Sequence, residues 1–162
     1  MTAIVPLVDW LSGWPGAVWL QQSGIAYLFV NATHILGIGL LLGSILPFDL
    51  LLIGFNRSAS TAIIGPLFLR IAATGLALAL MTGLWLFTVK PHEYIENPAF
   101  LTKMALLVLA LGNIAVQHMG TSFRAALRGE GAAVGVRLIA AISATLWLSV
   151  LVAGRWIGFV AL

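Results

Sequence analysis

Residues 24–54 read GIAYLFVNATHILGIGLLLGSILPFDLLLIG, and His34 and Asp49 are their only ionisable side chains besides one tyrosine. A helix needs about 20 mostly apolar residues to cross the hydrocarbon core of a bilayer, whereas a strand of a membrane barrel needs only about 10. The stretch is much longer than such a strand, and backbone in lipid must satisfy its own hydrogen bonds. It therefore predicts a membrane-spanning helix that continues past Pro47.

Three further apolar runs follow this first span, at about 61–89, 99–127 and 133–160. Segments rich in turn-forming residues separate the runs, at 56–60, 90–98 and 128–131. Together the four runs predict an all-α chain that forms a single domain, an integral membrane four-helix bundle.

Residues 5–22 precede the first span and carry three tryptophans, at positions 10, 14 and 19, with Pro15 between them. Tryptophan is enriched at the membrane–water interface. The segment predicts a short helix that lies in the interface, and a disordered tail is the alternative.

The composition excludes several classes of protein. Of 162 residues, 61% are hydrophobic and 8% are charged, against about 25% charged in a soluble domain. A net charge of +3 spread over such a chain is not a basic patch, so we expect no nucleic-acid partner. The chain has no cysteine, which excludes thiolate metal sites, iron–sulfur clusters and covalently attached haem.

Basic residues are biased toward one side of the predicted bundle. That side holds Arg57, Arg124, Arg128 and Arg137, against a single acid, Glu130. The positive-inside rule places these loops in the cytoplasm, so both termini and the 90–98 loop would face outward. On general grounds we expect the inner membrane of a bacterium.

Ionisable side chains inside the spans are the candidate functional residues, because Arg, Lys or Asp at the centre of a bilayer costs at least about 2.5 kcal/mol. These residues are His34, Asp49, Arg70, Lys103 and His118.

His34 lies about midway along the first span, with Asn31 one turn before it and Gly37 one turn after it. A neutral imidazole can bind haem iron, and the glycines leave room for something flat and bulky such as the macrocycle. The alternative is a histidine that is hydrogen-bonded across a close contact between helices.

A polar stripe on the third span is predicted to face the interior of the bundle. At about 100° per residue, a sector of about 120° contains Lys103, Ala110, Gln117, His118 and Thr121, with Asn113 at its edge. His118 is the preferred second haem ligand, although we expect it to lie about 10–15 Å deeper than His34. Lys103 is the substitute ligand or a propionate partner, unless it snorkels to the outer interface.

Three further residues have candidate roles. Arg70 could pair with a haem propionate, a quinone oxygen or Asp49. Arg155 shares the outer end of the bundle with Lys103, where two propionates would find cationic partners. His92, in the outward loop, is either solvated or a site for a metal ion or a proton.

Two patterns resemble small bacterial membrane proteins of the HemJ and CopD type and related uncharacterised four-helix membrane families. They are Asn31-Ala-Thr-His34-Ile-Leu-Gly-Ile-Gly-Leu, with the Pro47/Asp49 end of the same span, and Asn97-Pro98-x4-Lys103-x14-His118. In HemJ-like proteins a first-span histidine and a lysine at the start of a later span are associated with b-type haem. The resemblance implies these roles for His34 and Lys103. Residues 46–49 depart from the HemJ pattern, which has aromatic and arginine residues there.

The sequence as a whole predicts a membrane electron carrier that binds haem b. It would link a periplasmic or membrane redox subunit to the quinone pool, because its short loops leave little mass outside the bilayer for a catalytic site of its own. Whether it forms a homo-oligomer stays open. The alternatives are a HemJ-like protoporphyrinogen oxidase, a CopD-like copper or solute transporter, and a cofactor-free membrane anchor.

Overall fold

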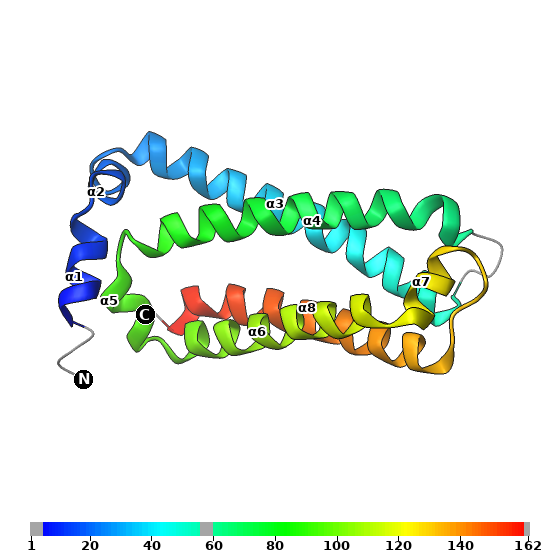
Figure 1. The fold of residues 1–162 in the computed structure, drawn as a ribbon. Helices are drawn as coiled ribbons and strands as arrows, with labels where there is room; N and C mark the ends of the chain where they lie inside the picture. The colour runs from blue at the N-terminus through cyan, green and yellow to red at the C-terminus, as the bar shows by residue number, and fades with distance from the viewer. Residues whose placement is uncertain (1–4, 56–59, 161–162) are drawn as a thin grey trace.

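The computed structural model describes residues 5–55 and 60–160, and all regular structure in these two ranges is α-helical. Four long helices form the bundle (Figure 1): α3 (Gly24–Ile53), α4 (Thr61–Phe87), α6 (Pro98–Met119) and α8 (Val134–Val160). Each of them is long and apolar enough to cross a membrane. The predicted all-α membrane helix bundle is therefore confirmed, and the chain is a multi-pass membrane protein.

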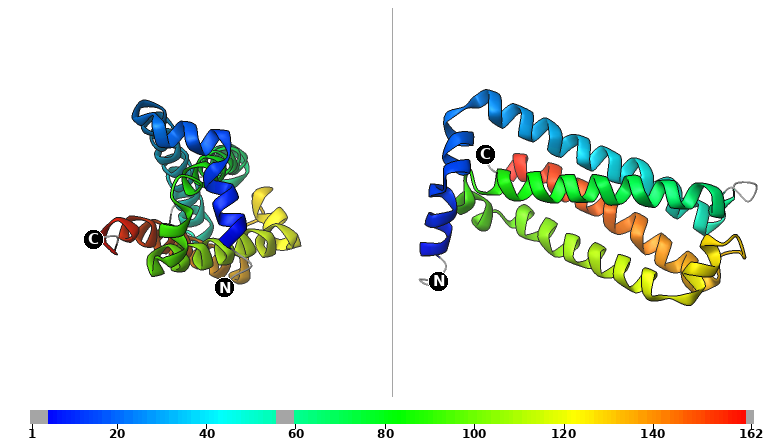
Figure 2. Two further views of the ribbon diagram at one scale, coloured as in Figure 1. Left: turned by 90° about the vertical axis from the view of Figure 1, so that its left-hand side faces the viewer. Right: turned by 45° about the horizontal axis from the view of Figure 1, so that its top comes forward.

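Four short helices lie at the two ends of the bundle. They are α1 (Val5–Gly13), α2 (Pro15–Gln22), α5 (Pro91–Glu96) and α7 (Thr121–Leu127). The first three gather at one end, here called the α1 end, and α7 lies at the opposite, α7 end (Figures 1 and 2). The 5–22 segment is thus helical, in two pieces that separate at Trp14, whose backbone is extended before Pro15. Arg57 lies outside the described residues.

The third predicted span differs from the structure at its end. We predicted one run over about 99–127, but α6 ends at Met119 and α7 is a separate helix. The break is at Gly120, whose backbone is extended, and glycine adopts non-helical conformations with little steric cost. At the other end Asn97 caps α6, because its side-chain oxygen accepts hydrogen bonds from the backbone of Ala99 and Phe100.

Helix α3 holds the bundle together, since it packs against both α4 and α8, while α6 packs mainly against α8. The crossing of α3 and α4 is close. A Cβ atom at Gly75 would lie only 2.5 Å from the Leu41 nitrogen and 2.7 Å from the Gly37 oxygen. Small residues permit such backbone contact between membrane helices.

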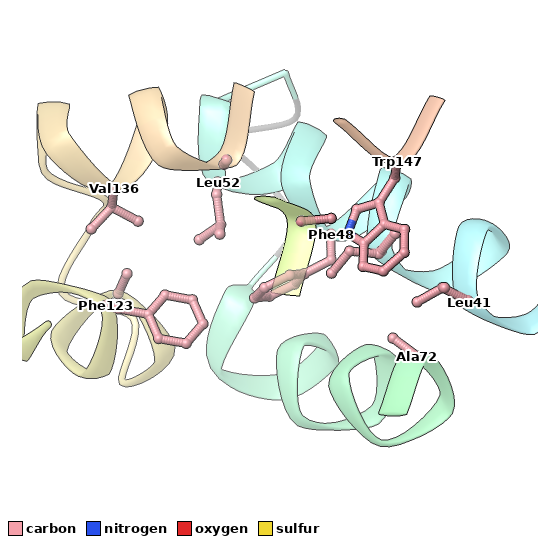
Figure 3. Close-up of a cluster of buried hydrophobic side chains, with 11 residues drawn as sticks. Leu41, Phe48, Leu52, Ala72, Phe123, Val136 and Trp147 are labelled. Carbon is pink, nitrogen blue, oxygen red and sulfur yellow. The ribbon is translucent and has the colours of Figure 1, made fainter. Parts of the chain in front are cut away.

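The buried hydrophobic cluster extends from the middle of the bundle to the α7 end (Figure 3). Trp147 and Phe48 are its largest fully buried side chains. The Phe48 ring meets the Phe123 ring edge-on at 6.2 Å, so α7 closes this end of the core.

Candidate functional site

Thr82 of α4 forms a hydrogen bond with the side chain of His34. Its Nδ1 atom lies 3.0 Å from the Thr82 hydroxyl oxygen, and that hydroxyl donates its only hydrogen to the Leu78 carbonyl at 2.6 Å. The Thr82 oxygen must then accept from the imidazole, so Nδ1 carries the hydrogen and Nε2 of the neutral ring carries a free lone pair. This is the tautomer in which Nε2 can bind a metal.

Gly83 provides the space for the His34 ring. A Cβ atom at this position would lie 2.9 Å from His34 Cε1 and 3.4 Å from Nδ1. A larger residue at position 83 would push the imidazole away from Thr82. Sequence reasoning missed Thr82 and Gly83, because a hydroxyl and a glycine in an apolar span are ordinary, and only their adjacency in Thr82-Gly83 offered a signal.

Lys103 lies on α6. Its side chain is half-buried and lies along α8, where its Cε is 3.5 Å from the place a Cβ of Gly154 would take. Four residues are grouped here with His34 as the candidate site, called the His34–Lys103 site. They are Thr82 and Gly83, which lie against the imidazole, and Lys103 with Gly154, which lie together between α6 and α8.

Gly37 and Asn31 flank His34 on α3. Gly37 is buried, and a Cβ there would lie 2.7 Å from the Ala79 nitrogen on α4. It thus serves the close helix contact, which is the second of the two roles that the sequence left open, and it provides no clearance for a macrocycle. Asn31 is half-buried one turn nearer the α1 end.

His118 is not brought to His34. It is exposed, its Nδ1 bonds to the Ile114 carbonyl at 2.9 Å, and its ring packs on Phe123 of α7 at 5.0 Å. It follows Lys103 by 15 positions on α6, which is about 22 Å along a helix. The predicted inward stripe holds for Ala110 and Gln117, which are buried, but not for His118, because the broad sector also included the exposed edge of α6.

The predicted pairing of Asp49 with Arg70 is not formed. Asp49 is fully buried, Arg70 is exposed on α4, and no ion pair within residues 5–55 and 60–160 includes either of them. Arg155 is exposed, and its guanidinium lies 4.8 Å from the ring centre of Phe159 on the same helix.

His92 bonds through Nε2 to Asp9 Oδ1 at 2.8 Å, which joins α5 to α1 at the surface. Its predicted roles in metal or proton binding stay predictions.

Two grooves on the surface of the described chain are lined by residues other than His34 and Lys103. One, of about 640 Å³, lies between α6 and α8 and is lined by residues such as Thr102 and Ser149. The other, of about 440 Å³, lies at the α1 end and is lined by Trp10, Trp14 and Trp85, among others. Within the described ranges no group of three or more His, Cys, Asp or Glu side chains could hold a metal ion.

Comparison with known proteins gives one result. The model of DUF6644, described as a family of unknown function, matches residues 10–160 of the chain. No curated protein and no solved structure gives a significant match.

Proposed function

The chain belongs to the DUF6644 family, and we propose that it is a membrane electron-transfer protein that binds haem b, with His34 as an axial ligand. The observation that carries the proposal is the hydrogen bond from His34 Nδ1 to Thr82, which leaves Nε2 with a free lone pair inside the bundle. Histidines that bind metals usually donate their other ring hydrogen to a fixed acceptor in this way.

The ligand set of the site favours a porphyrin over a bare ion. His34 is a single imidazole without a second or third ligand of the His, Cys, Asp or Glu type among the described residues. A porphyrin supplies four nitrogens of its own and needs only axial ligands from the protein. When bound, haem supplies the one-electron redox chemistry.

Lys103 takes the role that the sequence assigned first to His118. It either pairs with a haem propionate or, once deprotonated, acts as the second ligand. Either role explains why a lysine is half-buried between α6 and α8. We further propose an inner-membrane location with the α1 end outward, so that the site faces a periplasmic or membrane redox subunit, with the quinone pool as the other partner.

The visible spectrum of the detergent-purified protein tests the proposal. We expect a Soret band and α bands that sharpen on reduction, lost in His34→Ala and retained in His118→Ala, which removes an exposed imidazole from the same bundle. Lys103→Met should retain haem with a shifted spectrum if Lys103 is a ligand, and an unshifted spectrum if it binds a propionate. A colourless protein from a haem-replete host would overturn the proposal.

A HemJ-like protoporphyrinogen oxidase is the second candidate, because the resemblance assigns haem to His34 and Lys103, the residues proposed here to hold it. Complementation of a bacterial strain that lacks its protoporphyrinogen oxidase separates the two functions. An electron carrier would leave the strain uncomplemented even when it is loaded with haem.

A further inference from the structure

Asp49 is the one acid of the chain that is withdrawn from solvent. Its exposed fraction is 0%, whereas the other four acids are exposed: Asp9, Glu93, Glu96 and Glu130. Asp49 follows Phe48 on α3 and lies far along that helix from His34.

Among the residues that the structure describes, the surroundings of Asp49 hold hydrogen-bonding groups but no counter-ion. Ser143 of α8 is the neighbouring polar side chain. Trp147 follows Ser143 one turn later on the same helix and lies beside Phe48 (Figure 3). Both carboxyl oxygens, the Ser143 hydroxyl and the Trp147 indole nitrogen lack a hydrogen bond of acceptable geometry within the described residues. Ser143 is therefore near the carboxyl without completing a bond to it.

The cations on the elements around α3 do not compensate Asp49. Arg70 on α4, Arg124 on α7, and Arg137 and Arg155 on α8 are all exposed. Arg137 is bonded to the Ala132 carbonyl. Lys103 lies beside Gly154 of α8, and His118 is exposed at the end of α6. No ion pair among the described residues reaches Asp49.

An ionised carboxylate without a partner is strongly disfavoured in a membrane interior, whereas a neutral acid is tolerated there. We propose that Asp49 is a proton-binding site inside the bundle, held as a neutral carboxylic acid beside Ser143. The neutral group offers an O–H that can donate to the Ser143 oxygen.

The proposal does not depend on haem, and infrared spectroscopy of the intact protein tests it. Carboxylates on a protein surface ordinarily have pKa values of about 4, and the hydrogen bond from Arg128 lowers the pKa of Glu130 further. A carbonyl band of a protonated carboxyl would therefore come from Asp49 alone. We expect this band at neutral pH, a shift of it in D₂O, its loss in Asp49→Asn, and its retention in Glu96→Gln.

A second variant keeps the test decisive if Asp49→Asn fails to fold. The chain contains only two aspartates, Asp9 and Asp49. In Asp9→Asn protein labelled with carboxyl-¹³C aspartate, an isotope shift of the band assigns it to Asp49 without any change in the core. Absence of the band at neutral pH, or a band that the label does not shift, would overturn the proposal.

Discussion

The Thr82 hydroxyl decides which imidazole nitrogen of His34 is available to a metal. Because it accepts from Nδ1 and donates to Leu78, Thr82→Val should free the ring and weaken haem binding about 10- to 100-fold, the usual cost of losing the partner of a metal-binding histidine. Haem titration of apoprotein measures the change. Thr145→Val is the matched control, since the Thr145 hydroxyl is exposed and bonds only to Ala141 of its own helix. Equal affinities in the two variants would argue against a haem ligand at His34.

Candidate residues could be predicted where the free-energy cost of an ionisable group inside a membrane span is enough to mark them. His34, Asp49 and Lys103 stand out because ionisable groups are rare in apolar spans. Their partners could not be predicted, since the contact of Thr82 with His34 depends on how α3 and α4 cross. His118 failed as a partner of His34 because a sector of about 120° is too broad to separate the buried edge of a helix from the exposed one.

At the scale of elements, the close contact of α3 and α4 rests on Gly75. A Cβ there would meet backbone atoms of Leu41 and Gly37 at 2.5 and 2.7 Å, and backbone cannot move aside as a side chain can. Gly75→Ala should therefore separate the helices and lower the free energy of unfolding by about 1–3 kcal/mol. Unfolding in mixed micelles measures it, with Gly112→Ala as the control, because nothing lies within 4 Å of that position. Equal stability of the two variants would contradict the close crossing.

Helices α1 and α2 are attached to the bundle by Trp85. Its indole nitrogen donates to the Gly16 carbonyl at 3.0 Å, a bond worth about 0.5–1.5 kcal/mol. Trp85→Phe keeps an aromatic ring but loses the donor, so we expect several-fold faster amide hydrogen exchange in α1 and α2 and unchanged exchange in the long helices. The exposed Trp156→Phe should change neither. Uniformly faster exchange would instead indicate general destabilisation.

The long helices followed from the sequence because length and apolarity are sufficient to predict a span. The end of the third one did not, since Gly120 interrupts a sequence that stays apolar as far as Leu127. The sequence predicts a loop where helix α5 lies, because Pro91 and the charged residues around it are typical of turns. Its six residues form a helix that packs on α1 and α6.

At the scale of the whole molecule, α3 carries the half-buried His34 toward the α1 end and the fully buried Asp49 toward the α7 end. His34 is hydrogen-bonded to α4, whereas Asp49 follows Phe48, whose ring packs on Phe123 of α7. The proposed electron-transfer site and the proposed proton site thus lie in opposite halves of α3. Which compartment each one faces depends on the orientation of the bundle.

The orientation can be measured directly because the chain has no cysteine of its own. Exposed Arg124, Arg128 and Arg137 are at the α7 end, so the positive-inside rule places that end in the cytoplasm. In bacterial spheroplasts, a membrane-impermeant maleimide should label Glu96→Cys at once and Ser122→Cys only after lysis. Both positions are exposed, which makes each the control for the other. The reverse order of labelling would turn the His34–Lys103 site toward the cytoplasm and exclude a periplasmic redox partner.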